Sequence, residues 1–211
     1  MQYRWILEKQ ELDVSAAIFQ AEEIPGIGPV SAEPDPEAVR ESMEAKGLFM
    51  ETESGRRLEE SYELAVLTML SPEEYITLSA PGREMELANV YLRGETILAA
   101  VKDRDVTPYA FFWFPFIPMG IPAIYDMYRK CFDEAADGEE ILQFRLHEKD
   151  RPERTGSIRR SGDSCIFAEE GEAELPVSDE EAFAYLQHFL VYAHSRCMKR
   201  ALEETQTAAA E

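Results

Sequence analysis

The chain has 211 residues, 45% of them hydrophobic, which is enough to bury an ordinary core in one cooperative domain. Its 42 acidic and 21 basic residues give a formal net charge of −21, which repels phosphate backbones and anionic lipid. Nucleic acid and membrane surfaces are therefore poor partners for this sequence.

The first residues and the cysteines indicate a cytoplasmic protein. The segment from Met1 to Lys9 has no long apolar core, so it fits neither a signal peptide nor a membrane anchor. Cys131, Cys165 and Cys197 are odd in number and far apart, unlike the cysteines of a zinc site or a disulfide framework. We expect them to be small buried side chains in a reducing compartment, and we predict no cofactor.

The first third of the chain has the pattern of short helices. Asp35 and Pro36 provide an N-cap followed by proline at the first helical position, and Gly47 ends the helix that they begin. Leu48 to Met50 can form a brief extended piece. The predicted helices span about 9–22, 36–46 and 55–72, with a loop rich in proline and glycine at 24–29.

The middle of the chain has the pattern of strands. Alternating apolar residues separated by turn residues predict an antiparallel meander, and the chain then continues through a helix into further strands. Pro115, Pro118 and Pro122 are expected to stop any regular ladder before that helix begins. The predicted strands are 75–78, 84–92, 96–102, 109–114, 139–148, 157–169 and 173–177, and the helix is 123–132.

The last helix is the clearest element of the sequence. Ser178 to Glu181 form a capping box, and the helix is expected to run to about Glu203. Its aromatic residues lie on more than one face, which predicts a helix covered on both sides. Residues 205–211 are predicted to be a disordered tail, which leaves 1–204 as a single domain. The predicted fold class is α+β, an antiparallel sheet flanked by helices, in an order that allows two loosely related halves.

No residue pattern indicates catalysis, and we predict a protein without enzymatic activity. His188 and His194 are six residues apart, a spacing that does not place them on one helical face to hold a metal. His147 lies in a predicted strand and is assigned no role. Asp103 and Asp105 have the Asp-x-Asp spacing of some metal-dependent sugar transferases, but they stand among ordinary turn residues without a phosphate-binding glycine loop.

Residues 145–160 form the only basic island in the chain. Two interpretations are open for it. The island could receive an acidic segment of a partner, or it is a hairpin whose charges pair with neighbouring carboxylates. The second interpretation is favoured because opposite charges are common across paired strands. Its basic residues are Arg145, Lys149, Arg151, Arg154, Arg159 and Arg160.

The segment from Tyr109 to Pro122 concentrates aromatic surface in an otherwise acidic chain. Phe111 and Trp113 would lie on one side of a strand, and Phe112 and Phe114 on the other, so the strand is predicted to be covered on both faces. After the strand, the prolines hold the chain out of the ladder. The predicted partner-binding residues are Phe116, Ile117, Pro118 and Met119.

The order of the elements resembles the EspG family. The similarity lies in the opening Trp5-x-Leu7-x-x-x-Glu11-Leu12, the Gly47-Leu48 step between two helices, Leu70-Ser71-Pro72 at the end of the third helix, and the strand pair 84–92 and 96–102. Members of this family are cytosolic chaperones of type VII (ESX) secretion systems, with a mixed α+β fold of two related halves.

The resemblance implies a non-enzymatic chaperone or adaptor that shields an apolar helix tip of a protein client until delivery. This chain is shorter than the usual mycobacterial members, and nothing in the sequence shows that its host has a PE/PPE client. The client implied by the resemblance is therefore a small helical secretion substrate, of the WXG or LXG kind if not of the PE/PPE type. The family has no catalytic residues to carry over. The resemblance specifies neither the client-binding positions in this sequence nor the oligomeric state.

Two other classes of function stay open. The first is an acidic immunity protein that neutralises a basic toxin, whose binding would weaken steeply with salt. The second is a small enzyme with a site assembled from scattered carboxylates, which would require an acidic pocket with strongly shifted pKa values.

Overall fold

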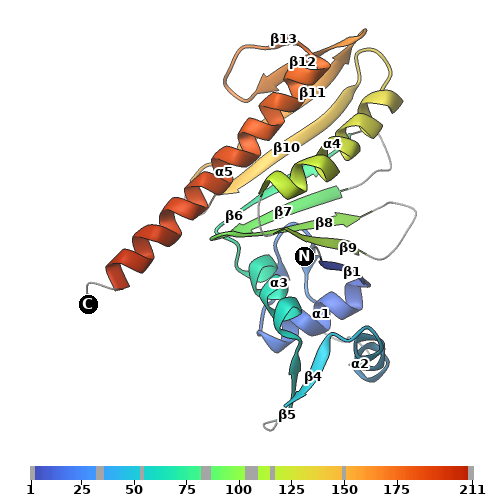
Figure 1. The fold of residues 1–211 in the computed structure, drawn as a ribbon. Coiled ribbons are helices and arrows are strands. Elements are labelled where there is room, and N and C mark those ends of the chain that lie inside the picture. Colours follow the sequence, from blue (N-terminus) through green and yellow to red (C-terminus); the bar gives the residue numbers. More distant parts are fainter. Residues whose placement is uncertain are drawn as a thin grey trace.

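The computed structural model has the predicted α+β fold, with helices on both faces of a nine-stranded antiparallel sheet (Figure 1). The structure describes residues 3–31, 36–52, 55–81, 87–102, 109–114, 117–148 and 151–208. Within these ranges, no helix combines the length and the apolar composition that crossing a bilayer requires.

The strands of the large sheet follow the chain in two groups. The group from the first part of the chain runs inward from an edge at β1, and the second group continues from β10 to the opposite edge at β13. The sheet order is β1 (Tyr3–Leu7), β9 (Tyr109–Phe114), β8 (Thr96–Lys102), β7 (Leu87–Arg93), β6 (Glu74–Ser79), β10 (Glu140–Glu148), β11 (Arg154–Ser161), β12 (Ser164–Glu169) and β13 (Leu175–Ser178).

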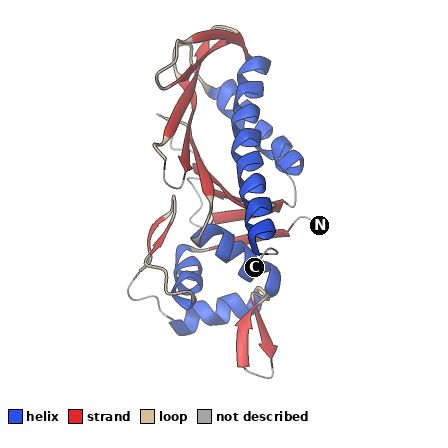
Figure 2. Cartoon of the chain, turned by 90° about the vertical axis from the view of Figure 1, so that its left-hand side faces the viewer, coloured by secondary structure: helices blue, strands red, loops and turns tan. Residues whose placement is uncertain are grey.

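Helices cover different parts of the two faces of this sheet, as the side view of Figure 2 shows. On one face, α1 (Lys9–Ile18), α2 (Pro36–Ala45) and α3 (Glu60–Leu70) enclose a core with the strands around β8. On the other face, α4 (Ile117–Glu134) and α5 (Asp179–Ala208) enclose a second core. Strand β8 belongs to both cores, because Leu98 and Ala100 face the first and Ile97 and Ala99 the second.

Some predicted boundaries were wrong. Residues 55–58, predicted as the start of a helix, form strand β5 (Gly55–Leu58), which pairs with β4 (Phe49–Thr52). The helix α3 begins only after Glu59, whose carboxylate accepts a hydrogen bond from the Tyr62 N–H. Another small hairpin, β2 (Glu23–Ile24) and β3 (Gly28–Pro29), occupies the predicted loop at 24–29.

The bounds of the last two helices also differ from those predicted. Helix α4 begins at Ile117 and not at 123, because a proline in the first turn, Pro118, loses no intrahelical hydrogen bond; Pro122 then lies inside the helix. Helix α5 runs to Ala208, so residues 205–208 continue the helix and are not a tail. No glycine or proline follows Glu203 to end it.

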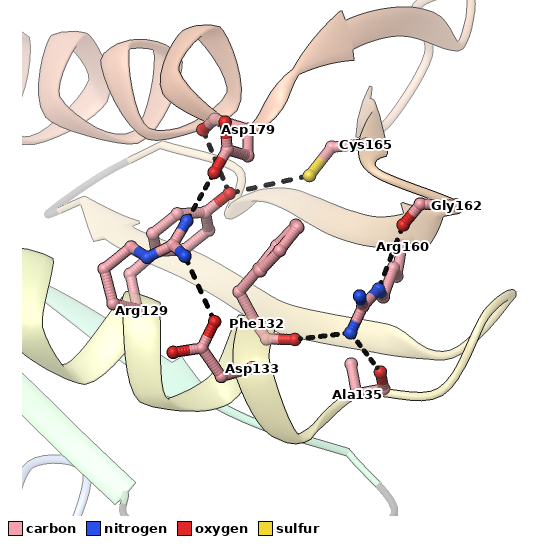
Figure 3. A network of polar contacts seen from close by, with 9 residues as sticks. Arg129, Phe132, Asp133, Ala135, Arg160, Gly162, Cys165 and Asp179 are labelled. Carbon is pink, nitrogen blue, oxygen red and sulfur yellow. Dashed lines mark hydrogen bonds and ion pairs between the residues drawn. The ribbon is translucent and has the colours of Figure 1, made fainter.

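A polar network joins the end of α4 to α5 and to the β11–β12 hairpin (Figure 3). Arg129 pairs with Asp179 at the first position of α5. Arg160 on β11 donates to the backbone oxygens of Phe132, at 3.1 Å, and Ala135, at 2.7 Å, which lie at the end of α4. The Arg160 bonds satisfy carbonyls that a helix leaves unpaired at its C-terminus, and the Arg129–Asp179 pair ties the start of α5 to α4.

A buried ion cluster holds the C-terminal half of α5 on the sheet. Glu74 of β6 and Glu148 of β10 are cross-strand partners, with side chains 0% and 3% exposed. Arg196 of α5 forms ion pairs with both carboxylates, and Arg200 lies 3.2 Å from Glu74. Burial raises the pKa of Glu74, and the two arginines oppose this shift. The cluster therefore balances two buried carboxylates with charges supplied by one helix.

Candidate protein-binding surface

The partner-binding segment predicted from the sequence lies at the start of α4. Phe116 is outside the described residues, and Ile117, Pro118 and Met119 open the helix, with side chains that are not described. Their role stays a prediction. The next residue, Gly120, is buried beside an apolar crevice of about 20 Å³ between α4, the sheet and α5.

The aromatic strand is confirmed as a strand, β9, and one of its faces is confirmed as core. Tyr109 and Phe111 are 6% and 3% exposed and pack in the core under α1 and α3. The side chains of Phe112, Trp113 and Phe114 lie outside the described residues, so cover on the second face stays a prediction. Asp103, Asp105 and Lys149 are also outside the described residues.

The basic island lies in the β10–β11 hairpin, and three of its arginines pair with carboxylates, as the favoured interpretation predicted, whereas Arg160 donates to backbone carbonyls. Arg145 lies 3.6 Å from Glu153, and Arg154 pairs with Glu169 on the neighbouring strand. Arg159 lies 3.1 Å from Glu174. The cysteines also agree with their prediction, because all three are buried and none forms a disulfide.

Beside α5, the strands β11 to β13 leave a groove of about 580 Å³ open to solvent, which we call the aromatic groove. One wall is the side of α5, the floor comes from β11 and β12, and the rim is the β12–β13 connection with the start of β13. Its lining residues are Arg154, Phe167, Glu169, Glu172, Ala173, Leu175, Tyr185, His188, Phe189 and Tyr192.

The aromatic groove exposes large apolar side chains. Tyr185 and Tyr192 are two helical turns apart on one side of α5, and they are 42% and 48% exposed. Leu175 on the opposite rim is 42% exposed. Phe167 on the floor stacks on Tyr185, with ring centroids 4.7 Å apart. Exposed apolar side chains that converge on one concavity are typical of a protein-binding surface.

Arg154 joins the floor of the groove to the wall formed by α5. Its guanidinium pairs with Glu169 and lies over the rings of Phe189, at 5.1 Å, and Tyr192, at 5.6 Å. These contacts fix both aromatic rings, and the positive charge of Arg154 is balanced inside the groove by Glu169 and the two ring faces. The groove therefore offers a partner a preformed surface, which lowers the entropy lost on binding.

Sequence reasoning missed this groove. The aromatic residues on two sides of α5 predicted a helix covered on both sides, and that prediction was wrong. Leu186 and Leu190 pack against the sheet, whereas Tyr185 and Tyr192 stay exposed. The available signal was the i, i+7 repeat of tyrosine beside an apolar helix face.

A second concavity, of about 660 Å³, lies on the opposite face of the sheet, where no helix of the described part covers β10 to β12 (Figure 2). Its floor is polar, with Thr77, Gln143 and Arg145 among the lining residues. His147 stacks on Tyr75, with ring centroids 4.1 Å apart, and its Nδ1 lies 2.7 Å from the Glu153 carboxylate. Burial lowers the pKa of His147, and Glu153 opposes this shift.

We find no metal-binding site among the described residues, 3–31, 36–52, 55–81, 87–102, 109–114, 117–148 and 151–208. These ranges contain no group of three or more histidine, cysteine, aspartate or glutamate side chains placed to hold an ion. Of the two concavities, only the aromatic groove combines exposed apolar side chains with a fixed floor.

Comparison with known proteins gives a likeness of fold. No protein-family model matches this sequence, and no curated protein does. Among solved structures, the chain is similar to the type VII secretion system chaperone EspG5 of Mycobacterium tuberculosis, solved in complex with a PE25–PPE41 dimer. The TM-score is 0.56 at 8% sequence identity, and the match covers 86% of this chain and 94% of that one.

Proposed function

We propose that this protein is a non-enzymatic cytoplasmic chaperone or adaptor for type VII secretion substrates, and that the aromatic groove binds its protein client. Two observations support the proposal. Over 86% of this chain, the fold is like that of a secretion chaperone that was solved in complex with a PE25–PPE41 dimer. The groove also leaves Tyr185, Tyr192 and Leu175 exposed beside a fixed floor.

The physical basis of this function is the removal of apolar surface from water. An exposed tyrosine of this kind presents on the order of 100 Å² to a partner, so covering it contributes about 2 kcal/mol before the cost of association. Binding would also cover the apolar surface of the client helix and so keep the free client from aggregating. The proposed segment Phe116, Ile117, Pro118 and Met119 would supply a second apolar contact.

Isothermal titration calorimetry with purified candidate clients tests this function. The clients are a PE–PPE heterodimer and helical hairpin proteins of the WXG and LXG kinds. We expect Tyr185→Asp to weaken binding at least tenfold, a loss of about 1.4 kcal/mol. Val191→Asp is the matched control, because Val191 is equally exposed on the same helix, at 41%, but does not line the groove.

Two negative outcomes of this experiment lead to different conclusions. Failure of every client class to bind would contradict the chaperone function. Binding that Tyr185→Asp leaves unchanged, but that Phe116→Asp or Met119→Asp abolishes, would move the client from the groove to the start of α4.

An immunity protein against a basic toxin is the second candidate function, and the net charge of −21 favours it. Its complex would depend on long-range charge, so affinity would fall steeply as salt rises. Binding through the aromatic groove would weaken much less with salt, because most of its contacts are apolar. Titrations of one client at low and high ionic strength distinguish the two functions.

A further inference from the structure

We propose that the aromatic groove selects an α-helical segment that carries lysine or arginine beside its apolar ridge, and that Glu172 contacts this cation. The inference rests on the proposed function, because it assumes that the groove is the client site. It adds a charge to the helical client of the proposed function, and it is supported by the edge of β13, the spacing of the tyrosines and the balance of charges in the groove.

The edge of the sheet beside the groove is closed to an added strand. Strand β13 pairs with β12 on one side, so alternate backbone groups point to its outer edge. Pro176 has no N–H, and the Ser178 N–H donates to the Glu181 carboxylate at 2.9 Å. These two alternate positions supply no free donor, so an extended peptide that pairs with β13 would leave its own carbonyls unbonded.

The exposed side chains of the groove suit a helix. Tyr185 and Tyr192 are seven residues apart on α5, which places them about 10.5 Å apart along the axis. Apolar side chains at i, i+3 and i+7 of a packed helix repeat over the same distance. Leu175 faces them from the other rim, so a helix lying along α5 would contact both walls.

The charges of the groove favour a cation on that helix. Arg154 is neutralised by Glu169, with which it forms an ion pair. Glu172 lies on the rim, where its backbone N–H donates to the Glu169 carbonyl at 3.0 Å and its side chain is exposed. The groove therefore presents an acidic rim on a chain of net charge −21, which disfavours an anionic helix and attracts a cationic one.

Labelled synthetic peptides test the inference by fluorescence anisotropy. The probe is a helical peptide of about five turns with leucine at i, i+3 and i+7, made in versions with lysine, glutamine or glutamate beside the leucine ridge. We expect the lysine version to bind about three to ten times more tightly than the glutamine version, and the glutamate version to bind most weakly. Glu172→Gln should remove the preference for lysine.

Glu174→Gln is the matched control, because Glu174 lies on the same connection but pairs with Arg159. It should leave the preference for lysine unchanged. Equal binding of the charge versions, or equal binding of a proline-containing version that cannot form a helix, would overturn the inference. So would the failure of every peptide to bind. A client that binds with affinity unchanged by Glu172→Gln would contradict the inference and leave the chaperone function standing.

Discussion

Gly156 of β11 lies directly opposite Phe144 of β10, and the phenyl ring occupies the space where a side chain at 156 would be. A Cβ atom added at Gly156 would lie 2.3 Å from Phe144 Cζ and 2.9 Å from the Ala168 carbonyl oxygen. Phe144 is fully buried, so its ring cannot move without disturbing the core under α5.

Gly156→Ala should therefore lower the free energy of unfolding by about 2–3 kcal/mol through overpacking. Ser157→Ala is the control, because Ser157 faces the open polar side of the same strand and should change stability by less than about 0.5 kcal/mol. Urea unfolding followed by circular dichroism measures both. Equal stability of the two variants would show that the ring of Phe144 can relax.

Arg196→Met should destabilise the protein by about 3–5 kcal/mol, because it leaves Glu74 and Glu148 buried without their shared partner. Lys199→Met is the control. Lys199 lies next to Arg200 in α5 but forms an exposed ion pair with Glu203 at 3.8 Å, so its loss should cost less than about 1 kcal/mol. Chemical unfolding of the two variants gives the comparison. A small loss in Arg196→Met would mean that Arg200 alone can balance the carboxylates.

Arg160→Met and Arg159→Met form a matched pair on one strand. Arg160 donates to two carbonyls at the end of α4, so its loss should cost about 2 kcal/mol. Arg159 forms an exposed ion pair with Glu174, and its loss should cost less than about 1 kcal/mol. Differential scanning calorimetry measures the two shifts in Tm. A larger shift for Arg159→Met would contradict the role assigned to the network in Figure 3.

His147 should make stability depend on pH. Burial lowers its pKa from the ordinary value of 6.5, so the folded protein favours the neutral ring. The stability that this group contributes is present above about pH 6.5 and is lost as the pH falls through the folded pKa. We expect His147→Gln to lose less stability than the wild type on acidification.

An NMR titration of the His147 ring measures that pKa directly. Glu153 opposes the effect of burial, so Glu153→Gln should lower the pKa of His147 further. A folded-state pKa above 6.5 in the wild type would show that the carboxylate and not burial controls this ring. An unchanged or raised pKa in Glu153→Gln would contradict the role assigned to Glu153.

Much of the fold was predictable because its signals are local. The meander of β6, β7 and β8 and the helix α5 follow from alternation, turn residues and a capping box within short windows. Strand β1 was missed because it is short and because its partner, β9, lies about a hundred residues later. Pairing at that separation leaves no pattern in either segment.

The aromatic groove was less predictable for a related reason. Its walls come from Tyr185 on α5, Leu175 on β13 and Arg154 on β11, which only the folded sheet brings together. Helical periodicity places the tyrosines on one side of α5, but whether that side is covered depends on where β13 ends. A single sequence does not specify that end.

The pairing of β1 with β9 also prevents self-association of the protein through the edge of β9. Strand β9 is Tyr-Ala-Phe-Phe-Trp-Phe, which has no charge to discourage self-association. Without β1, its backbone would form an open edge that another copy could pair with. Strand β1 is itself the edge of the sheet, and Lys46 donates to its Ile6 carbonyl at 3.0 Å. We therefore expect that a deletion or fusion that displaces Tyr3–Leu7 first causes oligomers and precipitation. Circular dichroism should still show a folded chain at that stage.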